Sequence, residues 1–177
     1  MSIAMTAHHK IETVQSAHHF EYLMQDMRVT YKHDLKVSVG SMTIDAREGD
    51  ISSVPRWLAK LLAEQGIIEI QDSDISAYVS RAFNRERISK PHDLSGLDPD
   101  FYIRVHDYLE GLMEREKESI TVSLLSFVAS RLEKIVKLAA SSPLSPELES
   151  RLSVEEKELY LMIHRYSSEF KQRVLKI

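Results

Sequence analysis

The chain of 177 residues contains no cysteine and only five glycines. A disulfide framework, a thiolate metal site and a cysteine nucleophile are therefore excluded. The sequence also lacks the glycine-rich phosphate loops and the G-x-S-x-G turn that presents a serine nucleophile. No stretch approaches about 18 consecutive apolar residues, and residues 1–20 have no apolar core of signal-peptide length. We therefore expect a cytoplasmic protein that does not span a membrane.

The chain has no excess of positive charge. It carries 23 Lys and Arg against 27 Asp and Glu, for a net charge of −4. Residues 1–71 hold 7 basic and 9 acidic groups, and residues 72–177 hold 16 and 18, so neither part is basic. Modules that bind nucleic acid through bulk electrostatics carry a basic surface. Little or no direct binding to nucleic acid is expected.

Titratable residues are not gathered in a familiar catalytic pattern. The histidine pairs His8–His9 and His18–His19 are ten residues apart, which matches no common ligand spacing, and we expect them to be solvated and unbound. There is no H-E-x-x-H motif and no Glu-x-x-His pair of the di-iron type. Carboxylates on the predicted helices have Lys or Arg three or four residues away, as solvated faces do. We predict no catalytic residues, no metal and no cofactor, and hence no enzyme.

Strands are predicted only in the first part of the chain. Residues 1–19 are polar without a clear period, and a loose or partly ordered lead-in is expected over residues 1–26. From residue 27 the sequence is rich in Val, Ile, Thr and Tyr and alternates with period two. The runs at 35–39 and 42–44, separated by Gly40-Ser41, predict a hairpin.

The stretch "SVPRWLAKLLAEQGIIEI", residues 53–70, predicts a helix followed by a strand. Ser52 or Ser53 is expected to cap the helix, and Gly66 to end it in the left-handed conformation. The strand "IIEI" would join the earlier hairpin. Residues 27–71 are therefore predicted to form a small α+β domain.

Trp57, the only tryptophan, lies in the predicted helix. One interpretation is that it fills the centre of the small domain together with Leu58. The other is that it is an exposed anchor for a partner protein.

Residues 72–177 are predicted to form an all-α bundle. Periodic apolar residues and caps indicate helices over 72–87, 99–112, 119–141 and 153–174. A connector containing Pro and Gly spans about 87–98. Ser153 and Glu156 fit a capping box. Short connections favour antiparallel packing, and the inward stripes, such as Leu124, Val128, Leu132, Ile135 and Ala139, are expected to be almost entirely apolar.

Arg131 borders the apolar stripe of the third predicted helix. It is three residues after Val128 and four before Ile135. In one interpretation its stem packs and its guanidinium reaches solvent. In the other it is partly buried and holds a carboxylate across a helix–helix contact.

Five stretches in this order resemble a GINS subunit, the replication factor that joins the MCM helicase. They are "EGD" followed by "VPRWLAKLLAEQGIIEI", then "LDPDFYIRVHDYLEGLME", "RLEKIVKLA" and "LSVEEKELYLMIHR". The first two are similar to the small B domain, and the last three to the helical A domain. The similarity covers roughly residues 34 to 170.

The resemblance implies a fold, an assembly and partners. A B domain that precedes the A domain is similar to the archaeal subunit of the Psf-two and Psf-three branch. Such a subunit would pair with one of reversed domain order in a tetramer, and would link the MCM helicase to a RecJ-like nuclease relative at the fork. The family implies no catalytic residues.

The matching apolar positions would build the domain cores or the subunit contacts. They are Trp57, Leu58, Phe101, Tyr102, Leu109, Arg131, Ile135, Leu159 and Tyr160. We thus expect a non-enzymatic, nucleoid-associated scaffold of the α+β class. The alternative is a dimeric winged-helix-like transcription regulator with a C-terminal helical dimerisation bundle. Its DNA-reading helix would need groups that contact phosphates, and Arg56 and Lys60, followed by Glu64, are a poor set for this. An enzyme using the bundle core would need titratable side chains that point inward.

Overall fold

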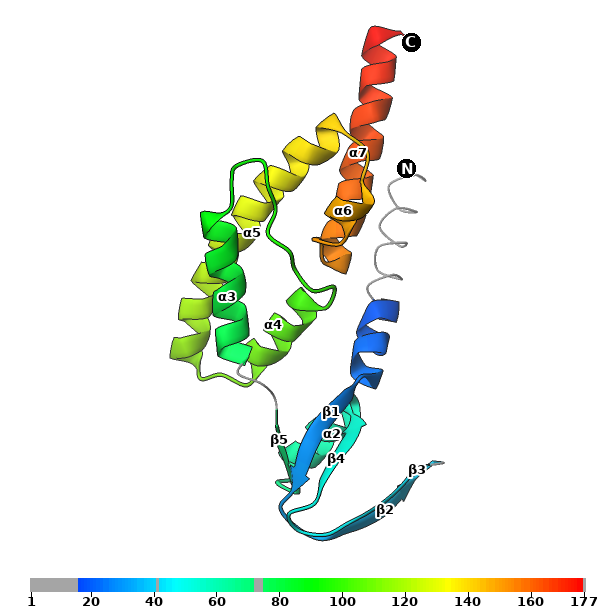
Figure 1. Ribbon diagram of the computed structural model, residues 1–177, viewed down its shortest axis with the longest axis vertical. Helices are drawn as coiled ribbons and strands as arrows, with labels where there is room; N and C mark the ends of the chain where they lie inside the picture. Colours follow the sequence, from blue (N-terminus) through cyan, green and yellow to red (C-terminus); the bar gives the residue numbers. More distant parts are fainter. Residues whose placement is uncertain (1–15, 41, 72–74, 177) are drawn as a thin grey trace. The chain divides into compact units, whose positions relative to one another are not determined.

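The computed structural model describes residues 16–40, 42–71 and 75–176 (Figure 1). These residues form two compact units, which divide just before Ile75. We call them the N-terminal unit and the helical unit. Among the described residues, no helix has both the length and the apolar character needed to cross a membrane.

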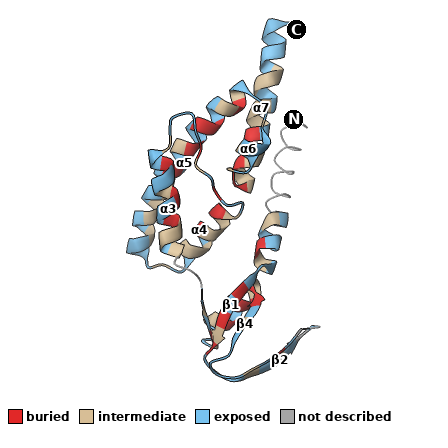
Figure 2. Ribbon diagram, viewed as in Figure 1, coloured by how far each residue is buried: buried red, intermediate tan, exposed pale blue. Residues whose placement is uncertain are grey.

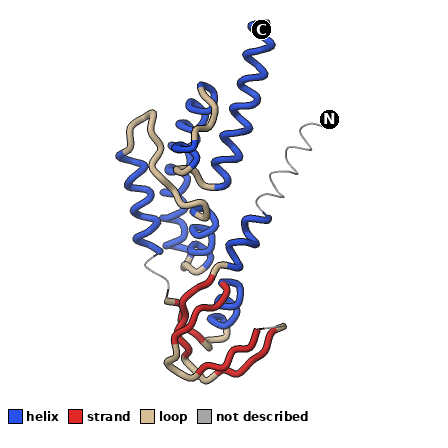
Figure 3. The backbone as a smooth tube through the Cα atoms, turned by 45° about the vertical axis from the view of Figure 1, so that its right-hand side comes forward, coloured by secondary structure: helices blue, strands red, loops and turns tan. Residues whose placement is uncertain are grey.

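The N-terminal unit combines a three-stranded sheet, a separate hairpin and one covering helix. Residues 16–24, which fall in the predicted loose or partly ordered lead-in, are helical. The elements that follow are β1 (Asp26–Tyr31), β2 (Leu35–Val39), β3 (Met42–Ala46), β4 (Ile51–Pro55), α2 (Arg56–Glu64) and β5 (Ile68–Ile70). The antiparallel sheet has the order β4-β1-β5, and β2 pairs only with β3 (Figure 3).

The predicted hairpin is confirmed, but the expected place of the last strand is wrong. Strand β5 pairs with β1, with Val29 opposite Ile70 and Tyr31 opposite Ile68, and not with the hairpin. The physical reason lies in β1, where alternate residues face the core: Met27, Val29 and Tyr31 are all buried. β1 is therefore the central strand on which both neighbours align their apolar faces.

Helix α2 covers this sheet with the face that buries Leu58, Ala59 and Leu62. The expected serine cap is wrong: Ser52 and Ser53 lie within β4, and the helix begins after Pro55 without a side-chain cap. The predicted end of the helix at Gly66 is confirmed. Gly66 has a φ of 71°, in the left-handed region, and its N–H donates to the carbonyl of Ala63.

The helical unit contains no strand among residues 75–176. Its helices are α3 (Ile75–Ile88), α4 (Phe101–Glu110), α5 (Glu114–Ser141), α6 (Pro146–Glu149) and α7 (Val154–Leu175). Helix α4 begins after Asp100 without a side-chain cap, and the carboxylate of Asp98 accepts the hydroxyl of Tyr78. The predicted capping box of Ser153 and Glu156 is confirmed.

The expected antiparallel arrangement is wrong for α5 and α7, which run side by side in the same direction (Figure 1). Arg131 contacts Glu156, and Ala139 contacts His164, so contacts advance together along both helices. The cause is the connection of residues 142–153, which contains α6 and carries the chain back from the end of α5 to a point beside its middle.

The connector between α3 and α4 is part of the core. Leu97 packs with Phe101, Val105 and Phe127 in one apolar cluster, whereas Leu94 packs in a second. The second cluster also contains Ile135, Ala139, Leu152 and Tyr160. Buried residues accordingly follow the inner faces of α3, α4 and α5 (Figure 2). The connector thus ties the two clusters together.

Gly66→Ala should destabilise the N-terminal unit by about 1–2 kcal/mol, because an L-residue is strained at positive φ. The added Cβ would meet nothing within 4 Å, so the cost is purely conformational. Urea unfolding followed by the fluorescence of Trp57, the only tryptophan, measures this unit. The control is Gln65→Ala, because Gln65 is an exposed neighbour in the same unit and has a φ of −81°. Equal midpoints for the two variants would contradict the assignment.

Candidate functional site

Arg131 lies at the centre of the helical unit and is 1% exposed. Its five N–H groups each meet an acceptor. Nε and Nη2 donate to the two carboxylate oxygens of Glu156 at 2.5 and 2.7 Å, a bidentate pair. Nη1 donates to Oε2 of Glu86 at 2.7 Å and to the carbonyl of Ser95 at 2.9 Å. Nη2 also donates to the carbonyl of Arg151 at 3.2 Å.

Glu86, from α3, is held equally completely. Its Oε1 accepts from Nζ of Lys134 at 2.5 Å, and its Oε2 accepts from the backbone N–H and the hydroxyl of Ser95. Lys134 also contacts the hydroxyl of Ser89. We call Glu86, Arg131, Lys134 and Glu156 the Arg131 network. Its two positive and two negative side chains balance, and all four are buried.

Glu156 has two roles because it is also the third residue of α7. Its Oε2 accepts the backbone N–H of Ser153, while Ser153 Oγ accepts the N–H of Glu156, which closes the capping box. Its Oε1 accepts the hydroxyl of Tyr102 at 2.8 Å, from α4. The start of α7 is thereby fixed to α4 and α5 at once.

The environment shifts three pKa values in the Arg131 network and its neighbour. Burial alone would raise the pKa of Glu86, but the hydrogen bonds from Lys134 and Ser95 and the charge of Arg131 outweigh it and hold the pKa below its usual value. Burial would lower the pKa of Arg131, and the bond to Glu156 reverses this and raises it. Burial and the carboxylate of Glu156 raise the pKa of Tyr102.

These contacts correct two expectations. Arg131 does not reach solvent, so the interpretation of a buried arginine holding a carboxylate is confirmed. The expected apolar interior is wrong, because four charged side chains point into it. Each charge is engaged by the others, so the arrangement joins helices and leaves no free base or acid among these four groups.

A groove of about 580 Å³ lies beside the Arg131 network, between α3 and α5. The rings of Phe83 and Phe127 are 4.9 Å apart on its lining, and Ser123 and Ser126 add hydroxyl groups. Glu86 also lines it, but the carboxylate of Glu86 is committed to Lys134 and Arg131. The groove therefore has an aromatic surface and hydroxyl groups that could contact a ligand, but no activated nucleophile among its lining residues.

The outer face of α5 is apolar and is not covered by the part of the chain that the structure describes. The predicted inward stripe is wrong at two positions, since Val128 and Leu132 are exposed while Phe127 and Arg131 point inward. The exposed apolar positions recur along the helix. They are Val122, Leu125, Ala129, Leu132 and Val136, which we call the α5 stripe.

A second uncovered apolar surface lies on the distal half of α7. Helix α5 ends at Ser141, and Lys171 already contacts the carbonyl of Ala140 near that end. The next turns of α7 extend past it (Figure 1). We call Tyr166, Phe170 and Val174 the α7 end, where Phe170 is 67% exposed.

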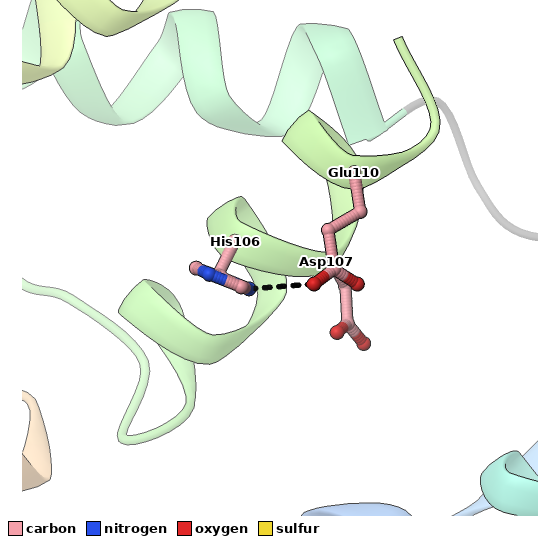
Figure 4. Close-up of side chains that lie close together, drawn as sticks. All are labelled: His106, Asp107 and Glu110. Atoms are coloured by element: carbon pink, nitrogen blue, oxygen red, sulfur yellow. Dashed lines mark ion pairs between the residues drawn. The ribbon is translucent and has the colours of Figure 1, made fainter.

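His106, Asp107 and Glu110 form a cluster on α4 (Figure 4). Each offers one ligand atom, and these atoms lie within 4.8 Å of one another. Nδ1 of His106 pairs with a carboxylate oxygen of Glu110 at 3.5 Å, and both side chains are largely exposed. The i,i+4 ion pair of a solvated helix face accounts for this geometry. Of the two histidine pairs in the sequence, His8 and His9 are outside the described residues, and His18 and His19 lie in the helical segment of residues 16–24.

The structure divides the sequence-predicted residues between both units. Leu58 is buried in the core of the N-terminal unit, and Trp57, the predicted core or anchor residue, is half-buried against it. In the helical unit the predicted residues belong to the two apolar clusters or to the Arg131 network and its neighbours: Phe101, Tyr102, Leu109, Arg131, Ile135, Leu159 and Tyr160.

Sequence reasoning missed Glu86, Lys134 and the second role of Glu156. The capping box gave a signal for Glu156, but it does not show that the same carboxylate binds Arg131. Glu86 lies 45 residues from Arg131 in the sequence and has no motif around it.

Arg131→Met should cost the helical unit about 3–5 kcal/mol of unfolding free energy, because it leaves Glu156 buried without its cation. Helical circular dichroism during urea unfolding measures this. Arg165→Met is the matched control, since Arg165 pairs with Glu169 on an exposed face, where such pairs contribute at most about 1 kcal/mol. A loss for Arg131→Met no larger than that of the control would show that the Arg131 network does not hold the helices.

The Arg131 network should also make the helical unit sensitive to acid. The pKa of Glu86 is lowered in the folded state, so its contribution is complete above about pH 5 and is lost as the pH falls through the ordinary glutamate value, about 4.3, toward the lower folded value. Unfolding free energies measured in pH steps should fall less steeply for Glu86→Gln than for the natural chain. Identical slopes would contradict this.

A comparison with known protein families gives a match that coincides with the helical unit. The Sld5 family model, described as the GINS complex protein helical bundle domain, matches residues 74–175, more than half of the chain. No curated protein matches the chain. The matched region contains all four members of the Arg131 network and both uncovered apolar surfaces. The chain belongs to the GINS family, whose members are subunits of a complex that acts in DNA replication.

Proposed function

We propose that this chain is a non-enzymatic scaffold subunit of the GINS complex, and that it assembles into a tetramer with a subunit of reversed domain order. The observation that carries the proposal is the pair of uncovered apolar surfaces on the matched helical bundle, the α5 stripe and the α7 end. Exposed apolar faces of this kind mark protein–protein contacts. Two separate surfaces are what a subunit needs to contact two neighbours.

The order of the units supports a particular branch. The β-containing N-terminal unit precedes the helical bundle, as expected for an archaeal subunit similar to the Psf-two and Psf-three branch. In this proposal the partner carries its helical bundle first. Each tetramer would contain two copies of each chain.

The α7 end has the chemistry of a contact with an unlike chain. Residues 164–176 carry four basic side chains and only one acidic side chain, Glu169, although the chain as a whole is acidic. Tyr166 and Phe170 lie among these charges. An acidic, apolar surface on the reversed-order subunit would be complementary to this combination.

The further partners in this proposal are the MCM helicase and a RecJ-like nuclease relative. The subunit would link them at the replication fork, and it would act in the cytoplasm on the nucleoid. The support is the family membership together with an interior whose charged groups are engaged with one another. Catalysis would reside in the partners.

The alternative of a transcription regulator requires α2 to present basic groups to DNA. In the structure the guanidinium of Arg56 lies over the ring of Tyr22, 4.2 Å from its centroid. Residue Arg56 is thus engaged inside the N-terminal unit, which favours a structural role for it.

Light scattering on a sizing column tests the assembly. Mixed with the reversed-order subunit from the same genome, the 20.4 kDa chain should give one species of four chains in equal amounts of each kind. Phe170→Glu should abolish the mixed species, because it places a charge in the α7 end. Ile88→Glu is the control, since Ile88 is 79% exposed but lies on α3.

Two results of these measurements would count against the proposed assembly. Failure of the natural chain to form any mixed species would refute the proposal. A stable dimer that ignores the partner subunit but retards a DNA fragment would support the regulator instead.

A further inference from the structure

The α5 stripe has the spacing of a coiled-coil seam. Its five members follow one another at intervals of three, four, three and four residues, which is the heptad repeat that brings one helix against another. Val122 and Leu125 are 68% and 65% exposed, and Leu132 and Val136 are 43% and 42% exposed. An inward-facing helix surface would have this spacing and be covered. Here the seam faces outward without a partner helix in the described chain.

The seam is complementary to itself when a second copy runs in the opposite direction. In an antiparallel pair, heptad positions a and d of one helix share layers with d and a of the other. Ala129 would then lie opposite Leu132 of the second copy, small against large. Val136 would lie opposite Leu125, and the two-fold axis repeats both layers. Such a surface satisfies the requirement of an isologous interface.

Charge selects the antiparallel direction. Glu118 occupies the position four residues before Val122 on the same face and is exposed. In a parallel pair, Glu118 would lie directly opposite its own copy, with like charges in contact. In the antiparallel pair it lies opposite a position beyond Ser141, where α5 has ended. The Ser126 hydroxyl would instead face Glu133 of the second copy, which it can hydrogen-bond.

We propose that the α5 stripe pairs with the α5 stripe of a second copy of this chain, antiparallel and about a two-fold axis between Ala129 and Leu132. Within the tetramer, on which this assignment of surfaces rests, the α5 stripe joins like chains and the α7 end joins unlike chains. A single-helix seam is small for a stable interface, which buries about 800 Å² per partner. We therefore expect the chain alone to dimerise only weakly, at micromolar concentration. The α5 contact becomes stable only in the full complex.

Disulfide trapping tests the geometry, because the natural chain has no cysteine. Leu125→Cys and Val136→Cys chains share a layer in the antiparallel pair, so an oxidised mixture of the two variants should give the mixed covalent dimer. Val136→Cys alone should not cross-link, since antiparallel pairing separates its two copies by 11 residues, about 16 Å along the helix, well beyond the Cα separation of about 7 Å that a disulfide tolerates. Cross-linking of Val136→Cys with itself and no mixed product would overturn the proposal.

Sedimentation equilibrium of the chain alone supplies the energetic test. Leu132→Glu should weaken dimerisation at least tenfold, because the two-fold axis introduces the charge twice. Leu161→Glu is the matched control, with the same 43% exposure on α7 and the same substitution. Helical circular dichroism checks that both variants fold. Equal weakening by both, or a natural chain that stays monomeric with no trapped dimer, would overturn the proposal.

The two proposals fail separately. A mixed complex with the reversed-order subunit that forms although the α5 stripe does not self-pair would remove only this inference. A two-fold dimer that takes up no partner subunit would keep the inference and remove the proposed function.

Discussion

The helical unit depends on one requirement, that the guanidinium of Arg131 be satisfied after it is removed from water. A buried arginine with an unpaired N–H would cost far more than a neutral group. The five acceptors come from α3, the connector, the turn before α7 and α7 itself, so satisfying the guanidinium fixes all four relative to α5. The parallel course of α5 and α7 follows, because Glu156 must lie beside Arg131, near the middle of α5, before α7 can begin.

A charged interior has a consequence for the outside of the bundle. Helix α5 turns Phe127, Arg131, Ile135 and Ala139 inward, whereas Val128 and the members of the α5 stripe are exposed. When a helix is apolar on two faces, only the face that packs against the core of its own chain stabilises the monomer. The other is an uncovered surface until a second helix removes it from water. The Arg131 network thus orients the α5 stripe outward, because the inward direction is already occupied by the ion pairs.

Local signals in the sequence predicted local structure well. The hairpin of β2 and β3, the left-handed Gly66 and the capping box of Ser153 each depend on a few neighbouring residues, and all three were predictable. Two local predictions were wrong, the serine cap of α2 and the loose lead-in at residues 16–24, which is helical. The other errors concern choices among distant partners. β5 pairs with β1 and not with the hairpin, because β1 has three buried alternate residues, which only the folded sheet reveals. The spacing of apolar residues fits both faces of α5 equally, so it does not show that Val128 and Leu132 face outward. Glu86 carries no motif, and its partners are 45 and 48 residues away.

Two kinds of surface on one chain determine what assembly can form. A chain with only a self-complementary face stops at a dimer, and a chain with only a face for an unlike partner stops at a heterodimer. In the proposed tetramer, the two kinds of contact together would close a ring of four chains. Closure of the proposed ring would also explain why a short α5 seam is sufficient. The α5 contact between like chains need not be stable alone, because the α7-end contacts with unlike chains would hold the two like chains close together and raise their effective concentration. In this proposal the α5 stripe and the charged, aromatic α7 end are complementary parts of one arrangement, because each makes a contact that the other cannot make.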